Sequence, residues 1–504
     1  MPATPSETPA VDGVGAVDRP HPVQFFNTMG RAVMPFTPLD GDHVRMYTCG
    51  PTVYNHVHIG NLRTFVFEDL LCRTLRFLGY RVTQVMNLTD VDDKTIRGAS
   101  EANLPLDDFT ATYIDSFFND LDTLQVVRAD HYPRATRHID DMITMIETLV
   151  AKEHAYVSDD GSVFFRIASD DDYGRLAGID PSGLRQGERV ASDEYDKESV
   201  RDFVLWKAAK DGEPSWNSPW GAGRPGWHIE CSAMSVAYLG NSFDIHGGGV
   251  DLIFPHHENE IAQTESATGE PFVHTWLHSE HLIVDGAKMS KSLGNQYTLK
   301  DLIARGVRPR VLRYLFLQTH YRQKLNFTFD SLGAAAAALR RVDALRHRLG
   351  HAPEAADARP AVGEAAETLL REVADALADD LGVPNALAAV FNYVKAINRA
   401  IDAGDGPQGL GAGDRQRALD AFDAVDVAFG VFRAEDWPAS DGEASDGAGD
   451  DGLSDADIDG LLAERQTARA ARDFARADEI RVQLTEAGIV IADTPDGPRW
   501  RRGD

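Results

Sequence analysis

The feature that most constrains this chain is a strand–helix–strand pattern between residues 44 and 86. Residues 44–49 (VRMYTC) favour a strand, and the turn sequence GPT follows them. Residues 60–78 carry apolar side chains at helical spacing, and Gly79 stands where a helix C-cap glycine belongs. Residues 81–86 favour a second strand. Two strands joined by a helix predict a parallel sheet in an α/β fold, with the ligand site at the carboxyl ends of the strands.

The charge of the chain argues at first sight against a nucleic-acid partner. Its 504 residues, enough for about three domains, include 50 Lys and Arg against 79 Asp and Glu, a net charge of −29. Only ten of the basic residues are Lys, so we expect a halophilic surface whose like charges are screened by salt. A simply acidic protein is the alternative. Three Cys cannot form a disulfide framework, which indicates a reducing compartment.

We expect this chain to have no targeting or membrane-spanning segment. Residues 1–24 lack the basic and apolar regions of a signal peptide, and we expect a disordered tail. No run of about 18 apolar residues is present, so we expect no membrane association and a cytoplasmic location. Residues 435–459 hold ten acidic residues and no basic one, which predicts a flexible linker.

The segment YNHVHIGNLRT, residues 54–64, lies between the first strand and the helix. Gly60 allows the backbone to approach a ligand closely, and the helix N-terminus offers free N–H groups to phosphates. His58 and Asn61 add hydrogen-bond donors beside that anion site. A polar turn with a satisfied His is the alternative for the segment taken alone.

A second anion-binding segment is KMSKS, residues 288–292. Lys288 and Lys291 can neutralise charge that develops on a transferring phosphate. Taken alone, the segment could also be a solvated loop. HIGN followed about 230 residues later by KMSKS resembles the nucleotide site of class I aminoacyl-tRNA synthetases.

Cys49, Cys231, His256 and Glu260 together suit a zinc ion, because zinc binds thiolate, imidazole and carboxylate ligands. His256 and Glu260 stand four residues apart and face one side of a helix, although His257 could replace His256 by its spacing. The alternative is that the Cys are buried small apolar residues, as expected for Cys72 within the first helix.

Longer segments carry a more specific resemblance. MYTCGPTVYNHVHIGNLRTFVFEDLL, NLTDVDDK, GWHIECSAM, FDIHGGGVDLIFPHHENEIAQ and KMSKSLGN are similar, in this order, to the cysteinyl-tRNA synthetase family. The match continues in RDFARADEIRVQLTEAGIVIADTPDGPRWRR and covers nearly everything from Phe25 to Arg502. Asn61 stands where the family often has His, and it can donate a hydrogen bond but cannot carry charge.

The resemblance implies a site for zinc, cysteine and Mg-ATP. The zinc ligands would be Cys49, Cys231, His256 and Glu260. A soft metal selects the cysteine thiolate over the serine hydroxyl, which an apolar pocket separates poorly. The cysteine-binding residues would be Thr52, Thr89, Trp227, His246 and Asp251. The ATP-binding residues would be His58, Gly60, Asn61, Gly247, Gly248, Gly249, Lys288, Met289, Ser290, Lys291 and Ser292, with His58, Asn61, Lys288 and Lys291 assisting the reaction.

The implied reaction has two steps. The cysteine carboxylate attacks the α-phosphate of ATP, giving cysteinyl-adenylate and pyrophosphate, and the terminal ribose hydroxyl of tRNA(Cys) then takes the cysteine. Residues 300–348 hold eleven basic and three acidic residues, a local charge of +8 that would meet the tRNA stem. Trp500 could stack on an anticodon base. We expect a monomer.

Two other functions share part of this pattern. A cysteine ligase acting on an amino-sugar would have the same zinc and nucleotide sites but no anticodon-binding end. A non-catalytic tRNA-binding paralogue would have eroded signatures.

The sequence divides into a Rossmann-like catalytic domain with an insertion, a helical bundle and a small mixed α/β anticodon-binding domain. The expected segments are a tail (1–24), two catalytic halves (25–125 and 216–286) around an insertion (126–215), the KMSKS and stem-contact region (287–335), the bundle (336–434), the linker (435–459) and the C-terminal domain (460–504).

Overall fold

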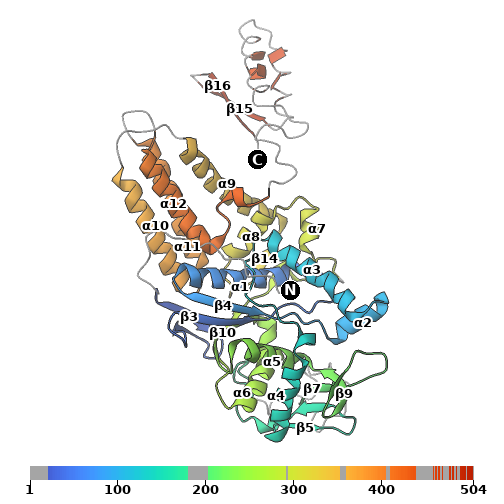
Figure 1. Ribbon diagram of the computed structural model, residues 1–504. Coiled ribbons are helices and arrows are strands. Elements are labelled where there is room, and N and C mark those ends of the chain that lie inside the picture. The colour runs from blue at the N-terminus through green and yellow to red at the C-terminus, as the bar shows by residue number, and fades with distance from the viewer. Residues whose placement is uncertain are drawn as a thin grey trace. The chain divides into compact units, whose positions relative to one another are not determined.

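The computed structural model describes residues 21–179, 202–290, 293–351, 359–403 and 409–438, scattered positions between 458 and 484, and two strands at 489–494 and 497–502. The chain forms two compact units, Met1–Ala434 and Glu435–Asp504 (Figure 1). Residues 1–20 of the expected tail (1–24) and residues 439–457 and 459 of the expected linker lie outside the described residues. The end of the expected tail is ordered instead, because Val23 and Gln24 begin strand β1 (Val23–Asn27).

A four-stranded sheet forms the centre of the first unit. Its strands run in the order β11-β10-β3-β4, and every neighbouring pair is parallel. The strands are β3 (His43–Thr48), β4 (Arg81–Met86), β10 (Phe243–Gly249) and β11 (Val273–Ser279). Helix α1 (Ile59–Phe77) joins β3 to β4. This confirms the expected strand–helix–strand unit, and the carboxyl ends of all four strands meet at one edge.

An insertion separates the two halves of this sheet. Helices α2 (Asp93–Ala102), α3 (Leu106–Thr123) and α4 (Ile139–Ala151) follow β4. An antiparallel sheet then has the order β5-β6-β7-β9-β8. Its strands are β5 (Ala155–Val157), β6 (Val163–Phe165), β7 (Phe203–Ala208), β8 (Trp216–Ser218) and β9 (Gly221–Pro225). The inserted sheet therefore continues to Pro225, ten residues beyond the expected boundary at 215.

Two helices return the chain to the central sheet. Helix α5 (Trp227–Leu239) precedes β10 and packs on β3, and α6 (Glu258–Thr268) precedes β11. A hairpin of β1 (Val23–Asn27) and β2 (Ala32–Phe36) packs beside β11. A buried apolar cluster runs from Tyr47 and Val85 of the central sheet through α4 to Trp206 of the inserted sheet, so insertion and sheet share one core.

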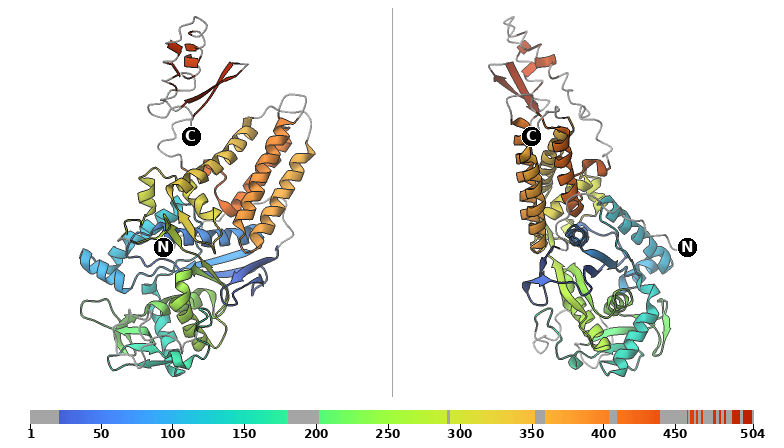
Figure 2. Two further views of the ribbon diagram at one scale, coloured as in Figure 1. Left: turned by 180° about the vertical axis from the view of Figure 1, so that it is seen from behind. Right: turned by 60° about the vertical axis from the view of Figure 1, so that its left-hand side comes forward.

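Helices dominate the rest of the first unit. A small sheet contains β12 (Leu282–Val284), β13 (Ala287–Lys288) and β14 (Leu325–Phe327). Along the chain, α7 (Leu299–Ile303) and α8 (Pro309–Gln318) lie between β13 and β14. The bundle follows with α9 (Phe329–His351), α10 (Pro360–Ala378), α11 (Val383–Asp402) and α12 (Ala412–Phe429). Figures 1 and 2 show the central sheet and α1 between the insertion on one side and the bundle on the other.

The second unit contains the antiparallel pair β15 (Ile489–Thr494) and β16 (Gly497–Arg502). Both strands lie in the segment 460–504, where a small mixed α/β domain was expected. Among the described residues, no helix combines the length and apolar character needed to cross a membrane.

The basic segment at 300–348 is partly neutralised by the fold. Its Arg side chains form ion pairs with acids that mostly lie outside the segment: Arg310 with Asp343, Arg313 with Asp69, Arg322 with Asp380, Arg346 with Asp423 and Arg348 with Asp402. Five of the eleven basic residues are thus engaged inside the protein, and the charge left for a ligand is smaller than the sequence suggested.

Candidate active site

The loop after β3 crosses the carboxyl edge of the sheet. Gly50 is required there, because a Cβ atom at this position would lie 1.8 Å from the backbone oxygen of Asn87. The Asn87 side chain accepts a hydrogen bond from the Gly50 nitrogen at 2.9 Å and donates one to Thr89 at 3.1 Å. Thr52 and Thr89 form a parallel bridge, so the two expected cysteine-binding threonines are neighbours.

His58 is the N-cap of α1. Its Nδ1 accepts hydrogen bonds from the backbone nitrogens of Gly60 at 3.1 Å and Asn61 at 3.2 Å. The Asn61 side-chain oxygen accepts from the His58 nitrogen at 3.3 Å, which completes a capping box. Burial lowers the pKa of His58, so its ring is neutral at pH 7.

The two nucleotide signatures lie against each other. A Cβ atom on Gly60 would lie 2.5 Å from Cε of Met289, so the Met289 side chain of the KMSKS segment packs directly on the start of α1. The backbone nitrogen of Ile59 also donates to Tyr297 at 2.9 Å. Asn295 shapes the loop, since its side chain accepts from the Ser290 nitrogen at 2.9 Å and donates to the Lys288 carbonyl at 3.2 Å. Lys291 and Ser292 lie outside the described residues.

Gly247, Gly248 and Gly249 form the end of β10, beside the loop after β3. The nitrogen of Cys49 donates to the carbonyl of Gly247 at 3.2 Å. A Cβ on Gly249 would lie 2.5 Å from a carboxylate oxygen of Asp251. The charge of Asp251 favours protonation of His58, which places this carboxylate near the start of α1.

Four buried side chains at this edge could hold a metal ion. Cys49, Cys231, His256 and Glu260 each offer an atom within 4.8 Å of the others. Cys49 directly follows β3, and Cys231 lies in α5. His256 comes from the π-helical turn Ile253–His257, and Glu260 comes from α6. The contact between His256 Nε2 and Glu260 Oε1 measures 3.0 Å. Segments more than 200 residues apart in sequence thus converge on one point.

The charges of this cluster suit a cation. The Cys49 thiol donates to Cys231 and, with His256, lowers the pKa of Cys231 to about 6, while burial raises the pKa of Cys49. Burial opposes the charge on Glu260, but His246 and His256 lower its pKa to about 2. Burial likewise opposes the charge on His256, but Glu260 and Cys231 raise its pKa to about 10. A thiolate and a carboxylate at neutral pH are the ligand forms that bind zinc.

An alternative group of Cys49, His246, His257 and Glu260 also satisfies the spacing for a metal. In that group Nε2 of His257 lies 3.4 Å from Sγ of Cys49, and its Nδ1 lies 2.8 Å from Nε2 of His278. Nε2 of His246 lies 2.9 Å from Oε2 of Glu260. We favour the group with Cys231, because two sulfur ligands suit zinc better than one, and His246 then orients Glu260 from behind.

Trp227 lies at the solvent side of the cluster. Its ring stacks on that of His256 with centroids 4.2 Å apart, and the residue is 38% exposed. His246 is buried and stacks on Trp276 instead. Of the two residues expected to close a cysteine pocket, Trp227 therefore lies at the exposed side of the four-residue cluster and His246 lies in the buried interior.

Glu230 is a buried residue of this region that sequence reasoning missed. Its side chain contacts Thr89, and Oε2 has no hydrogen-bond partner among the described residues. Burial raises the pKa of this carboxyl. Its position immediately before Cys231 could have suggested a place near the site. Its burial, however, depends on tertiary packing that the sequence does not show.

Comparisons with known proteins agree with this geometry. Residues 35–337 match the family of class I (C) tRNA synthetase catalytic domains. The solved Mycobacterium tuberculosis methionyl-tRNA synthetase in complex with methionyl-adenylate shares the fold, with a TM-score of 0.57 at 16% identity over 77% of this chain and 90% of that chain. The fold and the matched domain define a class I aminoacyl-tRNA synthetase.

More similar relatives narrow the family. Residues 372–432 match the DALR domain, and residues 451–501 match the anticodon-binding domain of cysteinyl-tRNA ligases. The chain is 47% identical to the cysteine--tRNA ligase of Solibacter usitatus, over 95% of this chain and 99% of that protein. It is 46% identical to the cysteine--tRNA ligase of Chlamydia pneumoniae, over 94% of this chain and 97% of that protein. The chain belongs to the cysteinyl-tRNA ligase family.

Proposed function

We propose that this chain activates L-cysteine with ATP and transfers it to the 3′-terminal ribose of tRNA(Cys). The observation that carries the proposal is the meeting of three groups at one sheet edge. These are the buried Cys49–Cys231–His256–Glu260 cluster, the capped start of α1 at His58, and the Met289 loop packed over Gly60. A sulfur-binding metal site beside an anion-binding helix terminus suits the joining of cysteine to a nucleotide.

Zinc fits the four side chains because they supply two sulfur atoms, one imidazole and one carboxylate in a buried position. When bound, the ion would hold the substrate thiolate and disfavour the serine hydroxyl. His246 would fix the orientation of Glu260, and Trp227 would cover the pocket from the solvent side. Thr52 and Thr89 would bind the amino group or the nearby backbone.

The nucleotide would lie across the glycine end of β10 and the start of α1. The backbone N–H groups of Ile59, Gly60 and Asn61 already have acceptors within the protein. The positive end of the α1 dipole would therefore attract the phosphates, and the side chains of His58 and Asn61 would donate hydrogen bonds to them. Lys288 and Lys291 would stabilise the charge that develops as pyrophosphate leaves Mg-ATP. No side chain needs to act as a covalent nucleophile, because positioning and charge stabilisation suffice for both steps.

We also propose that the acidic surface suits a salt-rich cytoplasm and that the protein is a monomer. Screening by salt reduces repulsion within a chain of net charge −29. We therefore expect thermal stability and activity to rise with potassium chloride, and we expect tRNA binding to depend on shape and base contacts more than on phosphate contacts. Loss of activity at high salt would contradict this part of the proposal.

Two assays in high potassium chloride test the function. Cysteine-dependent ATP–pyrophosphate exchange and charging of tRNA(Cys) with cysteine are both expected. Exchange without charging would favour a ligase that uses a small amino-sugar acceptor, and the absence of both would favour a non-catalytic tRNA-binding protein. The described C-terminal strands and the matched anticodon-binding domain argue against the small-molecule ligase.

A further inference from the structure

A separate cavity of about 610 Å³ opens between α2, α3 and the loop that leads to α1. Tyr54 and Asn55 form one wall, Lys94 and Arg97 of α2 form a second, and Tyr113 of α3 contributes a third. None of these residues was assigned to cysteine, zinc or ATP. The cavity thus combines two cations with aromatic rings, and Glu101 contributes an acidic group at its margin.

The walls of this cavity are held in place before any ligand binds. His56 contacts α3 twice, through a 2.6 Å contact from Nδ1 to Ser116 Oγ and an edge-to-face contact with Tyr113. Gly98 of α2 packs on the Phe109 ring, where a Cβ would lie 2.4 Å from Cζ. Only glycine therefore lets α2 and α3 approach this closely.

The insertion anchors the start of α2. Asp93 forms ion pairs with Lys207 of β7 at 2.8 Å and with Arg224 of β9, and both cations are almost fully buried. Lys207 and Arg224 are thus neutralised within the protein. The residue after Asp93 is Lys94, which lines the cavity. Its Nζ lies 5.2 Å from the centre of the Tyr54 ring, in cation–π contact.

The same short loop connects the cavity to the reaction site. Tyr54 follows two residues after Thr52 and precedes His58 by four, and its nitrogen donates to the Thr52 carbonyl at 3.0 Å. We infer that this cavity binds the unpaired nucleotides next to the 3′ end of the tRNA, which directs the terminal ribose toward the cysteinyl group. The exposed Tyr54 ring would stack on an unpaired base and the two cations would contact phosphates, a combination typical of single-strand binding. This inference rests on the proposed function.

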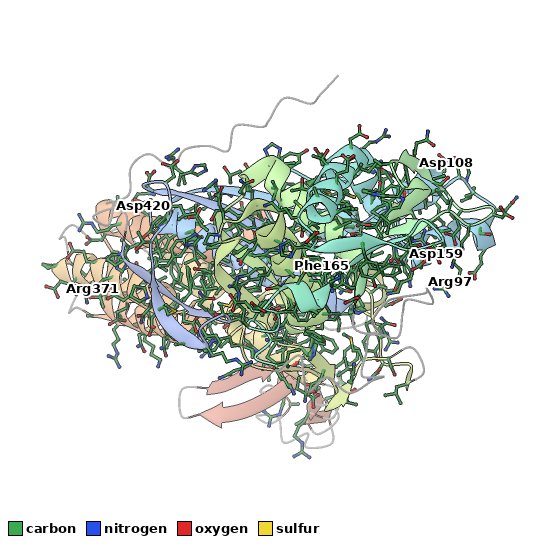
Figure 3. All side chains as sticks on the ribbon, turned by 90° about the horizontal axis from the view of Figure 1, so that it is seen from below. Arg97, Asp108, Asp159, Phe165, Arg371 and Asp420 are labelled. Atoms are coloured by element: carbon green, nitrogen blue, oxygen red, sulfur yellow. The ribbon has the colours of Figure 1, made fainter. Side chains whose placement is uncertain are left out.

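The test compares two forms of tRNA(Cys), one complete and one lacking its three unpaired 3′ nucleotides. Binding of each is measured for the wild-type protein, for the double variant Lys94→Gln and Arg97→Gln, and for Arg371→Gln as a control. Arg371 is an exposed residue of α10, and Figure 3 shows it and Arg97 at opposite ends of the first unit.

Wild-type protein should bind the complete tRNA about tenfold more tightly than the shortened one, the size of one base stacking contact. The double variant should lose this difference while it binds the shortened tRNA like wild type, and Arg371→Gln should keep the difference. Equal weakening toward both tRNAs, or no weakening, would overturn the inference. A raised KM for ATP in the double variant would assign the cavity to the nucleotide and also overturn it. If the wild-type protein showed no cysteine-dependent ATP–pyrophosphate exchange, that result would instead overturn the proposed function.

Discussion

The guanidinium group of Arg313 donates a hydrogen bond to the carboxylate of Asp69, and neither side chain is exposed to solvent. Arg313 lies in α8 and Asp69 in α1. Arg313 also donates to the Phe429 carbonyl at the end of α12 at 2.9 Å and to that of Leu124 after α3 at 3.1 Å. One buried cation thus joins the helix that begins at His58 to the helical bundle.

Replacing Arg313 should destabilise the protein strongly. Arg313→Met leaves the Asp69 carboxylate buried with Arg73 as its remaining cation, and breaking a buried pair costs about 3–5 kcal/mol. Arg346→Met is the matched control, because its pair with Asp423 is partly exposed and contributes at most about 1 kcal/mol. Urea unfolding at pH 7.5 measures the free energy of unfolding of both variants. Equal losses would contradict the larger contribution expected from the buried Arg313 pair.

The proposed zinc ligands Cys49, Cys231, His256 and Glu260 predict that two buried cysteines, Cys231 and Cys72, respond differently to replacement by serine. Cys231→Ser removes a sulfur ligand and should release zinc and abolish the preference for cysteine over serine. Cys72→Ser should retain both, because Cys72 is buried in α1 outside the cluster. The readouts are metal content by mass spectrometry and the rates of ATP–pyrophosphate exchange with cysteine and with serine. Full zinc content in Cys231→Ser would contradict the ligand assignment.

The contact between Gly60 and Met289 predicts a loss of rate rather than of stability. In Gly60→Ala the new Cβ would lie 2.5 Å from Cε of Met289 and 3.0 Å from Cε1 of His58, so the Met289 tip and the His58 ring must both shift. Misplacement of catalytic groups by this amount should lower the exchange rate by about tenfold or more. The double variant Gly60→Ala and Met289→Ala should recover part of the rate. Gly413→Ala, where a Cβ meets no atom within 4 Å, should leave the rate unchanged.

Asp120 in α3 predicts a pH dependence of stability. Burial raises the pKa of Asp120 to about 6, whereas an unfolded Asp titrates near about 3.9. Between these values the folded state binds more protons than the unfolded state, so stability falls as pH rises from about 4 to 6 and then levels off. Asp120→Asn should therefore stabilise the protein by about 1–2 kcal/mol at pH 7 and much less at pH 4.5. Urea unfolding at both values tests this, and a pH-independent gain would contradict the assignment.

Much of the fold could be predicted from the sequence because the relevant signals are local. The apolar period of α1, the glycine at residue 79 and the strand at 81–86 depend on neighbours along the chain. Helix α2 was not predicted, because it is short and polar on average, and only a few small side chains mark its buried face. The inserted sheet was recognised only as short strands, since its order β5-β6-β7-β9-β8 depends on pairing between distant segments.

The sequence by itself determined the residue types of the site: two sulfur atoms, an imidazole and a carboxylate, a glycine at a helix start, and a loop with two lysines. Only the tertiary structure decided how they meet. It brought Cys49 and Cys231 together, packed Met289 over Gly60, and paired five of the eleven basic residues of 300–348 with acids, four of which lie outside that segment. The physical reason is range. Backbone propensity and capping act over a few residues, whereas burial, ion pairing and metal-ligand geometry depend on contacts between segments that only the folded chain brings together.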